Sequence, residues 1–189
     1  VTELVIPEGI TEIKEYAFFN CTSLTSITIP DSVTSIGGGA FEYCTSLTSV
    51  TIGDSVTNIG WGAFNGCTSL NAVYITDIAA WCNISFRYNT SNPLDYAKKL
   101  YLNGKLVTEL VIPEGITEIK EYAFYDYDSL TSVTIPDSVK IIGESAFWGR
   151  SNLTDVYYTG SEEEWSAIDI GSFGNDSLTS ATIHYNHIP

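Results

Sequence analysis

The chain has 189 residues, of which 44% are hydrophobic and 16% are charged, and its formal net charge is −15. This composition predicts a folded chain with a sizeable core and excludes an intrinsically disordered one. The acidity excludes binding to nucleic acid, whose phosphates would be repelled, and charge-driven binding to anionic membranes.

The dominant pattern along the chain is an internal repeat of 23 residues. An Ala-Phe pair marks the repeat at 17–18, 40–41, 63–64, 123–124 and 146–147. Residues 1–18 also recur without change as residues 107–124, so a block of several units is itself repeated. We predict a single repeat domain over residues 1–189, with units that begin near residues 1, 24, 47, 70, 107, 130, 153 and 178 and one longer, irregular unit at 70–106.

Each simple unit predicts a short strand, and the second unit shows it most clearly. This unit begins LTSITIP, in which Ile27 and Ile29 alternate with Ser26 and Thr28. Alternation with period 2 points the two isoleucines inward and Ser26 and Thr28 outward. The proline that follows cannot donate to a continuing ladder, so the strand is expected to end there.

The rest of each unit predicts the opposite wall of a coil and its filling. Val33 and Ile36 indicate a second short buried segment, and the Ala-Phe pair then closes the coil with the ring inside. One coil cannot bury its apolar face alone, so successive coils are expected to stack. The stack predicts a ladder of phenylalanines formed by Phe18, Phe41, Phe64, Phe86, Phe124, Phe147 and Phe173.

Two units depart from the simple repeat and predict short helical turns. They contain DIAAWCNISF at 77–86 and SEEEWSAI at 161–168. Ser161 is a predicted N-cap, and the three glutamates after it suit the first turn of a helix better than a catalytic pair. We expect Trp81 and Trp165 to pack onto the solenoid.

The insert at 87–106 begins with a polar loop and continues as LYLNGKLV. Asn103 and Gly104 form a dipeptide that is typical of a tight β-hairpin turn. The insert therefore either adds a strand to the main sheet or projects from it as a hairpin.

The repeat LTSITIPDSVTSIGGGAFEYCTSL resembles the 23-residue leucine-rich repeat of BspA-like, or treponemal-type, surface proteins. DIAAWCNISF, KKLYLNGKLVTELVIPEG and YYTGSEEEWSAIDIGSFGNDSLTSATIHYN resemble repeat variants in large surface proteins of anaerobic gut and oral bacteria. The resemblance covers essentially the whole chain. It implies a leucine-rich-repeat solenoid, a right-handed, β-rich α/β horseshoe arc with a parallel sheet on its concave face and turns or helical turns on its convex face. It also implies export, surface display and adhesion or protein binding.

Outward strand positions form two columns on the predicted concave face. The first column contains Glu3, Ser26, Ser49, Ala72, Glu109, Ser132, Asp155 and Ser180. The second contains Val5, Thr28, Thr51, Tyr74, Val111, Thr134, Tyr157 and Thr182. Serine and threonine are typical of a water-facing sheet, and Tyr74 and Tyr157 interrupt them once in each half of the chain. These rings either pack on their neighbours or anchor a protein or a sugar.

The candidate binding residues follow from these columns, and two tryptophans add a second candidate surface. The concave-face candidates are Ser26, Thr28, Ser49, Thr51, Tyr74, Glu109, Thr134, Asp155 and Tyr157. Trp61 and Trp148 stand where other units hold Glu, Gly, Asn, Tyr or Phe. Both are therefore candidates for exposed contact residues.

Cys21, Cys44 and Cys67 fall at the same position of successive units and are expected to stack. A disulfide or a metal site is one interpretation. Packed thiols are favoured, because parallel Cβ directions suit a disulfide poorly and three cysteines cannot all pair. No pair of cysteines shows a zinc-binding spacing.

Other side chains with possible chemistry do not form a recognisable site. Asp31, Asp54 and Asp137 form a row at the strand ends, but the carbonyl-rich spacing of a calcium loop is absent. His184 and His187 lack further ligands by spacing, and no catalytic motif occurs. We predict no metal, no cofactor and no catalytic residue.

We expect a non-catalytic protein-binding or adhesion module, whose partner is a host or bacterial surface protein. The alternatives are a module that binds a glycan or a cell-wall polymer through Tyr74, Tyr101 and Tyr157, and a structural spacer that displays other domains. The expected location is extracellular or the bacterial cell surface. The sequence has no methionine and no leader, so we expect a fragment that lacks its signal peptide. No apolar run is long enough to cross a membrane, and we expect no membrane insertion by this segment.

Overall fold

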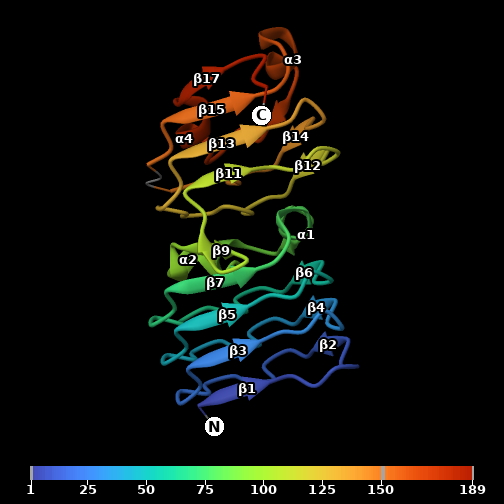
Figure 1. Cartoon of the computed structure of the whole chain (residues 1–189). Coiled ribbons are helices and arrows are strands. Elements are labelled where there is room, and N and C mark those ends of the chain that lie inside the picture. Colours follow the sequence, from blue (N-terminus) through green and yellow to red (C-terminus); the bar gives the residue numbers. More distant parts are fainter. Residues whose placement is uncertain (1, 150–151, 189) are drawn as a thin grey trace.

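The computed structural model describes residues 2–149 and 152–188 as a solenoid of stacked coils (Figure 1). Val1, where the first unit is predicted to begin, lies outside these residues. Each simple coil contributes one strand of three or four residues to a main sheet and one strand of two residues to a second sheet. The paired strands of successive simple coils keep the 23-residue register, as in Glu3 with Ser26 and Ser26 with Ser49.

The long strands form two main sheets, where the sequence columns predict one continuous sheet. The first main sheet contains β1 (Glu3–Val5), β3 (Ser26–Thr28), β5 (Ser49–Thr51), β7 (Ala72–Ile75), β9 (Leu100–Leu102) and β10 (Lys105–Leu106). The second contains β11 (Glu109–Val111), β13 (Ser132–Ile135), β15 (Asp155–Tyr158) and β17 (Thr182–His184). All strand pairs are parallel except β9 with β10. We call residues 2–106 the first block and residues 107–188 the second block.

The insert at 87–106 realises both predicted alternatives, and it ends the first main sheet. Strand β9 pairs with β7, so that Tyr101 follows Tyr74, and β10 then folds back antiparallel on β9. The predicted column is therefore wrong where it runs directly from Tyr74 to Val111. The hairpin presents an antiparallel strand at the edge of the sheet, so the parallel ladder starts again at β11.

The short strands line the opposite wall of the coils, as the buried positions Val33 and Ile36 predict. They are β2 (Glu12–Ile13), β4 (Ser35–Ile36), β6 (Asn58–Ile59) and β8 (Ser85–Phe86) in one sheet, and β12 (Glu118–Ile119), β14 (Ile141–Ile142) and β16 (Asp169–Ile170) in another.

Helices occur in the two irregular units and are four or five residues long. They are α1 (Ile78–Cys82), α2 (Leu94–Ala97), α3 (Glu162–Ser166) and α4 (Asp176–Thr179), with a 3₁₀ turn at Asn89–Ser91. Ser161 caps α3, as predicted. The structure adds that Ser161 and Glu164 bond reciprocally and that Asp77 caps α1. Trp81 and Trp165 are buried, as predicted. In the described residues, none of the helices has the length and apolar character that a bilayer crossing requires.

The phenylalanine ladder is confirmed for the simple coils. Ring centroids are 5.3 Å apart from Phe18 to Phe41 and from Phe41 to Phe64, and 5.4 Å apart from Phe124 to Phe147. The spacing is close to that of the stacked strands, because each ring repeats the place of the ring in the coil before it.

The ladder does not include Phe86 or Phe173, so these two predictions are wrong. Phe86 lies in β8 opposite Ile59 and tilts against Trp81. Phe173 is 60% exposed and stacks on Trp148 at the surface. Both belong to irregular units, whose extra residues move the ring to another point of the coil.

The register of the last strand also differs from the prediction. Asp155 pairs with Thr182 and Tyr157 pairs with His184, so the two columns end at these residues. The predicted partners were Ser180 and Thr182. The helical turn α4 takes up residues before the strand, and this moves the strand two positions along the chain.

Candidate functional site

A stacked tyrosine pair stands on the outward face of the first main sheet. Tyr74 of β7 and Tyr101 of β9 are in register, with ring centroids 4.9 Å apart and planes 28° apart. Both rings are half-buried, and Thr51 lies beside Tyr74 on the other side. In-register parallel strands lie about 4.8 Å apart, so equal positions on neighbouring strands bring planar rings face to face.

The second main sheet carries an equivalent aromatic pair. Tyr157 of β15 stacks on His184 of β17 with centroids 4.7 Å apart and planes 16° apart. The ring of His187 also contacts Tyr157, at 4.7 Å and 43°. His184 takes the place that Tyr101 has in the first block, because each belongs to the strand that follows the helical-turn unit.

A carboxylate completes the group in the second block. His184 Nε2 lies 2.7 Å from Asp155 Oδ1, and Thr154 Oγ1 donates a hydrogen bond of 2.7 Å to Asp155 Oδ2. Hydrogen bonds from His184 and then Thr154 hold the pKa of the Asp155 carboxyl below its ordinary value. The outward face of this sheet therefore offers aromatic surface beside a carboxylate and an imidazole.

All nine sequence-predicted candidates lie on the main sheets and are half-buried or exposed, but the structure does not bring them together. Five lie on the first sheet, namely Ser26, Thr28, Ser49, Thr51 and Tyr74. Four lie on the second, namely Glu109, Thr134, Asp155 and Tyr157. Strands β9 and β10 follow the first group and precede the second. Their role in binding stays a prediction.

The sequence-based choice missed the histidines of this face. The sequence by itself presents His184 and His187 only as possible metal ligands and Tyr101 only as a possible contact for a glycan. An alignment of LYLNG at 100–104 with IHYNH at 183–187 would have placed Tyr101 and His184 at the same position of their blocks.

Aromatic side chains also gather along one edge of each block. Trp61 is 43% exposed and Trp148 is 38% exposed. In the first block the edge cluster contains Tyr16, Phe19, Tyr43 and Trp61, with centroids 5.7–5.9 Å apart. In the second it contains Tyr122, Tyr125, Trp148 and Phe173, with centroids 5.5–6.3 Å apart.

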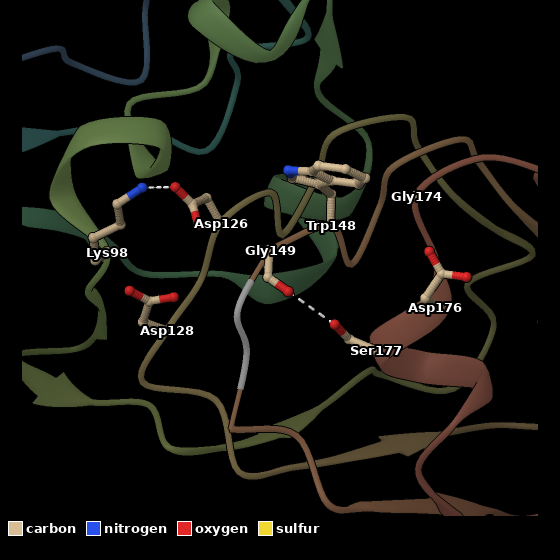
Figure 2. Close-up of a pocket in the computed structure, with 8 residues that line it drawn as sticks. All are labelled: Lys98, Asp126, Asp128, Trp148, Gly149, Gly174, Asp176 and Ser177. Atoms are coloured by element: carbon tan, nitrogen blue, oxygen red, sulfur yellow. Dashed lines mark hydrogen bonds and ion pairs between the residues drawn. The ribbon is translucent and has the colours of Figure 1, made fainter.

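A surface pocket of about 500 Å³ lies where the end of α2 approaches the second block (Figure 2). Lys98 forms an ion pair with Asp126, and Ser177 Oγ donates a hydrogen bond of 2.9 Å to Gly149 O. Its lining residues are Lys98, Asp126, Asp128, Trp148, Gly149, Gly174, Asp176 and Ser177. Three carboxylates against one ammonium favour cations over anions. None of these residues belongs to the predicted binding columns.

The stacked cysteines act as packing groups. Cys44 Sγ donates a hydrogen bond of 3.1 Å to Phe18 O, and Cys67 Sγ donates one of 3.2 Å to Phe41 O. Burial raises the pKa of Cys44 to about 11 and that of Cys67 to about 12, so the thiolate form is disfavoured. All four cysteines of the chain are free in the structure.

The aspartate row also has a structural role at the turns between coils. Asp54 N donates a hydrogen bond of 2.9 Å to Asp31 Oδ1, and Thr76 Oγ1 donates one of 2.5 Å to Asp54 Oδ2. Within residues 2–149 and 152–188, no group of three or more His, Cys, Asp or Glu side chains is arranged to hold a metal ion.

Comparison with protein families gives a match along the chain. The family model described as "BspA type Leucine rich repeat region" matches in six copies over residues 1–96 and 98–188. The comparison with curated proteins gives no match.

Among solved structures, the chain is similar to a leucine rich cell surface protein from Faecalibacterium prausnitzii, with 31% identity over 89% of this chain and a TM-score of 0.42. A leucine rich repeat protein from T. pallidum shows 26% identity over 82% of this chain and 68% of its own, with a TM-score of 0.48. One from Bacteroides ovatus shows 25% identity over 98% of this chain and 63% of its own, with a TM-score of 0.38. The chain spans 35% of the length of the Faecalibacterium protein.

Proposed function

Because the chain belongs to the BspA-type leucine-rich-repeat family, we propose that it is a non-catalytic protein-binding module displayed at a bacterial surface. Its partner is a host protein or another bacterial surface protein. The observation that carries this proposal is the recurrence of a stacked aromatic pair at the same place on both main sheets.

The aromatic pairs have the properties of binding anchors. Each ring of Tyr74 and Tyr101 is already held by its neighbour, so little conformational entropy is lost when a partner covers it. Thr51 lies beside Tyr74 on the sheet and can donate and accept hydrogen bonds, and Leu106 lies opposite Tyr101. Aromatic anchors with a polar surround are typical of protein interfaces.

Two anchors on one chain favour an extended partner. Tyr74 lies in β7 of the first main sheet and Tyr157 lies in β15 of the second. Four main-sheet strands lie between them in chain order, namely β9, β10, β11 and β13. A partner that contacts both pairs gains affinity from the second contact, because that contact is intramolecular. The surface location is proposed from the family and from the relative described as a cell surface protein.

The test uses matched variants in a binding assay with purified host matrix proteins. We expect Tyr74→Ala/Tyr101→Ala and Tyr157→Ala/His184→Ala each to weaken binding by at least about tenfold, as loss of an aromatic anchor does. Tyr88→Ala is the control, because Tyr88 is an aromatic side chain that is 55% exposed and lies outside the main sheets. Surface plasmon resonance measures each affinity. Binding that both double variants retain in full would remove the main sheets from the proposal.

Recognition of a glycan or cell-wall polymer is the second candidate function. The group around Tyr157 favours it, since aromatic faces beside a carboxylate can stack on a sugar ring and bind its hydroxyls. A glycan array with the wild-type chain and with Tyr157→Ala decides between the two. Glycan binding that Tyr157→Ala abolishes, without binding to any matrix protein, supports the second candidate. Absence of both activities leaves the role of a structural spacer.

A further inference from the structure

The wall opposite the main sheet has a hollow on its outer face in the first block. This wall is built by the short strands β2, β4, β6 and β8, of which the first three stack one above another in Figure 1. The hollow has a volume of about 420 Å³ and lies over Gly37, Gly38 and Gly60. Because these residues have no side chains, its floor is formed by backbone. The polar and aromatic side chains around it are those of Glu12, Glu15, Ser35, Asn58, Trp61 and Arg87.

Trp61 provides a flat aromatic face at this hollow. A Cβ atom at Gly38 would lie 2.6 Å from Trp61 Nε1 and 2.9 Å from Trp61 Cδ1, so the indole rests directly on the glycine of the coil before it. Tyr16 packs against the indole edge to face, with ring centroids 5.7 Å apart. The ring is therefore held on two sides, yet Trp61 is 43% exposed. An aromatic ring that is fixed before binding loses little conformational entropy when a ligand stacks on it.

Polar groups stand next to this ring at places that the sheet fixes. Ser35 and Asn58 hold the outward positions of β4 and β6 and are paired in register, so their side chains are neighbours. Arg87 directly follows β8 and occupies the position that Gly60 has one coil earlier. None of the ion pairs among the residues that the structure describes includes Arg87. A hydroxyl, an amide and a guanidinium group therefore face a ligand in the hollow.

The corresponding wall of the second block lacks these features and offers a comparison within the chain. The replacements are Ser35 by Ile141, Gly38 by Glu144, Asn58 by Asp169 and Trp61 by Ser172. Ser172 Oγ donates a hydrogen bond of 3.3 Å to Glu144 Oε1, so polar side chains meet where the first block has an indole on a glycine. The hollow with its aromatic face is thus a property of the first block and does not follow from the repeat itself.

The chemistry of the hollow fits a sugar better than a peptide. A sugar ring has an apolar face that stacks on an aromatic side chain, and its hydroxyls suit amide, carboxylate and guanidinium groups. A peptide is commonly held by a free sheet edge or by an apolar pocket that takes a side chain. Strands β4 and β6 are paired on both sides, and the floor of the hollow is glycine backbone, so this wall offers neither.

Charge at the hollow favours a neutral sugar. The carboxylates of Glu12 and Glu15 come from the first coil, and the guanidinium of Arg87 comes from the irregular unit. Two carboxylates against one guanidinium, on a chain with a net charge of −15, repel a sugar that carries carboxylate or sulfate groups. A cationic ligand would instead have to lie beside Arg87, which repels it.

We propose that this wall of the first block binds a neutral oligosaccharide, which stacks on Trp61 and forms hydrogen bonds with Asn58 and Arg87. The ligand lies along the stacking direction of the coils, because the residues around the hollow come from successive coils. The site is separate from the aromatic pairs of the main sheets and does not depend on the partner proposed for them. A shallow, solvent-exposed site binds one ligand weakly, with a Kd between about 10 μM and 1 mM.

The experiment starts with a glycan array that carries neutral oligosaccharides of glucose, galactose, mannose and N-acetylglucosamine together with acidic ones. The neutral glycan with the strongest signal is then titrated against the whole chain by isothermal titration calorimetry. Trp61→Ala removes the aromatic face, and Gly38→Ala keeps the tryptophan but displaces it from its place. Trp148→Ala is the matched control, because Trp148 is 38% exposed and its ring also lies against a glycine, Gly174. Tyr157→Ala is the control for the main sheets.

We expect the wild type and both controls to bind the neutral glycan equally, and Trp61→Ala and Gly38→Ala each to weaken binding by at least about tenfold. Trp61→Phe keeps an aromatic face and should retain most of the affinity, while circular dichroism checks that every variant is folded.

Four results would overturn the proposal. They are the absence of any neutral glycan that binds with a Kd below about 1 mM, stronger binding of acidic glycans, unchanged binding in Trp61→Ala, and binding that only Tyr157→Ala abolishes. A peptide from a random library that binds in a Trp61-dependent manner, where no glycan binds, would assign the hollow to a protein partner and equally contradict the proposal.

Discussion

Gly60 lies so close to Gly38 of the preceding coil that a Cβ atom at position 60 would come within 2.5 Å of the Gly38 nitrogen. The same contact recurs one coil earlier and in the second block, where a Cβ at Gly37 or Gly143 would meet the backbone of the coil before it. Lys120 holds this position in the first coil of the second block, which follows the irregular unit instead of a simple coil. Glycine therefore lets one simple coil stack closely on another. The backbone conformation itself accepts a side chain, since Arg87 holds the equivalent position of the irregular unit, where its N–H donates to Ile59 O as Gly60 N–H donates to Ile36 O.

Gly60→Ala is expected to lower the free energy of unfolding by about 1–3 kcal/mol, because the coils must separate to admit the methyl group. Lys120→Ala is the control, because Lys120 is a side chain that the second block already accommodates at this position. The substitution should change the free energy of unfolding by less than about 1 kcal/mol, since it removes only a surface ion pair with Glu118. Urea denaturation measures both. Equal effects of the two substitutions would show that coil stacking does not select the glycine.

Phe41→Ala is expected to lower the free energy of unfolding by about 3–5 kcal/mol. The Phe41 ring is fully buried and stacks on Phe18 and on Phe64. Phe173→Ala should lower it by less than about 1 kcal/mol, since Phe173 is 60% exposed. Thermal or urea unfolding of both variants tests which phenylalanines belong to the buried ladder. A large loss of unfolding free energy in Phe173→Ala would contradict the surface position of this ring.

Asn92→Ala is expected to lower the stability of the junction between the blocks by at least about 2 kcal/mol. The substitution removes the amide that donates to Tyr122 O and Ala123 O, and Asn92 itself is fully buried. We also expect the single unfolding transition to divide into two, because each coil contacts only the adjacent coils and the weakened junction no longer couples the two blocks. Tryptophan fluorescence reports on both blocks.

Asn83→Ala provides the control for the junction. Asn83 is exposed, and its amide bonds to Ala79 O within its own unit, so only about 0.5–1 kcal/mol should be lost. A junction variant that unfolds in one transition with unchanged stability would show that the side-chain donors do not couple the blocks.

One thiol of the four is expected to react rapidly with a thiol-specific reagent at pH 8 in the folded chain. Cys21 is exposed, whereas Cys44, Cys67 and Cys82 are buried. Burial raises the pKa of Cys44 to about 11 and the pKa of Cys67 and Cys82 to about 12. Cys21→Ser should abolish the fast reaction, and all thiols should react in denaturant. Two or more fast thiols would contradict the buried stack.

The same thiols predict that the chain loses stability in alkaline solution. Their pKa values are raised in the folded state above the ordinary value of 9.0, so folding favours the neutral form. This contribution is complete below pH 9 and decreases as the pH rises toward 11–12. The difference in unfolding free energy between the wild type and Cys67→Ala should therefore shrink between these pH values in urea titrations.

Much of this molecule could be predicted from its repeat because every simple coil has the same local sequence pattern. The alternation of Ile27 and Ile29 with Ser26 and Thr28 determines which side chains enter the core, and the 23-residue spacing determines their neighbours. The helical turns around Trp81 and Trp165 could likewise be predicted from the sequence, the second with Ser161 as its N-cap. For the candidate site, the alternation placed Tyr74 and Tyr157 on the outward face of the main sheets.

Tertiary packing determined the structure wherever a unit differs in length from the simple 23-residue repeat. The end of the first main sheet at β10, the surface position of Phe173 and the pairing of His184 with Tyr157 all occur in or after irregular units. A regular repeat places each residue by translation of the previous coil, so local sequence is sufficient there. An inserted helical turn breaks that translation, and the register beyond it depends on how the turn packs on coils that are distant in the chain.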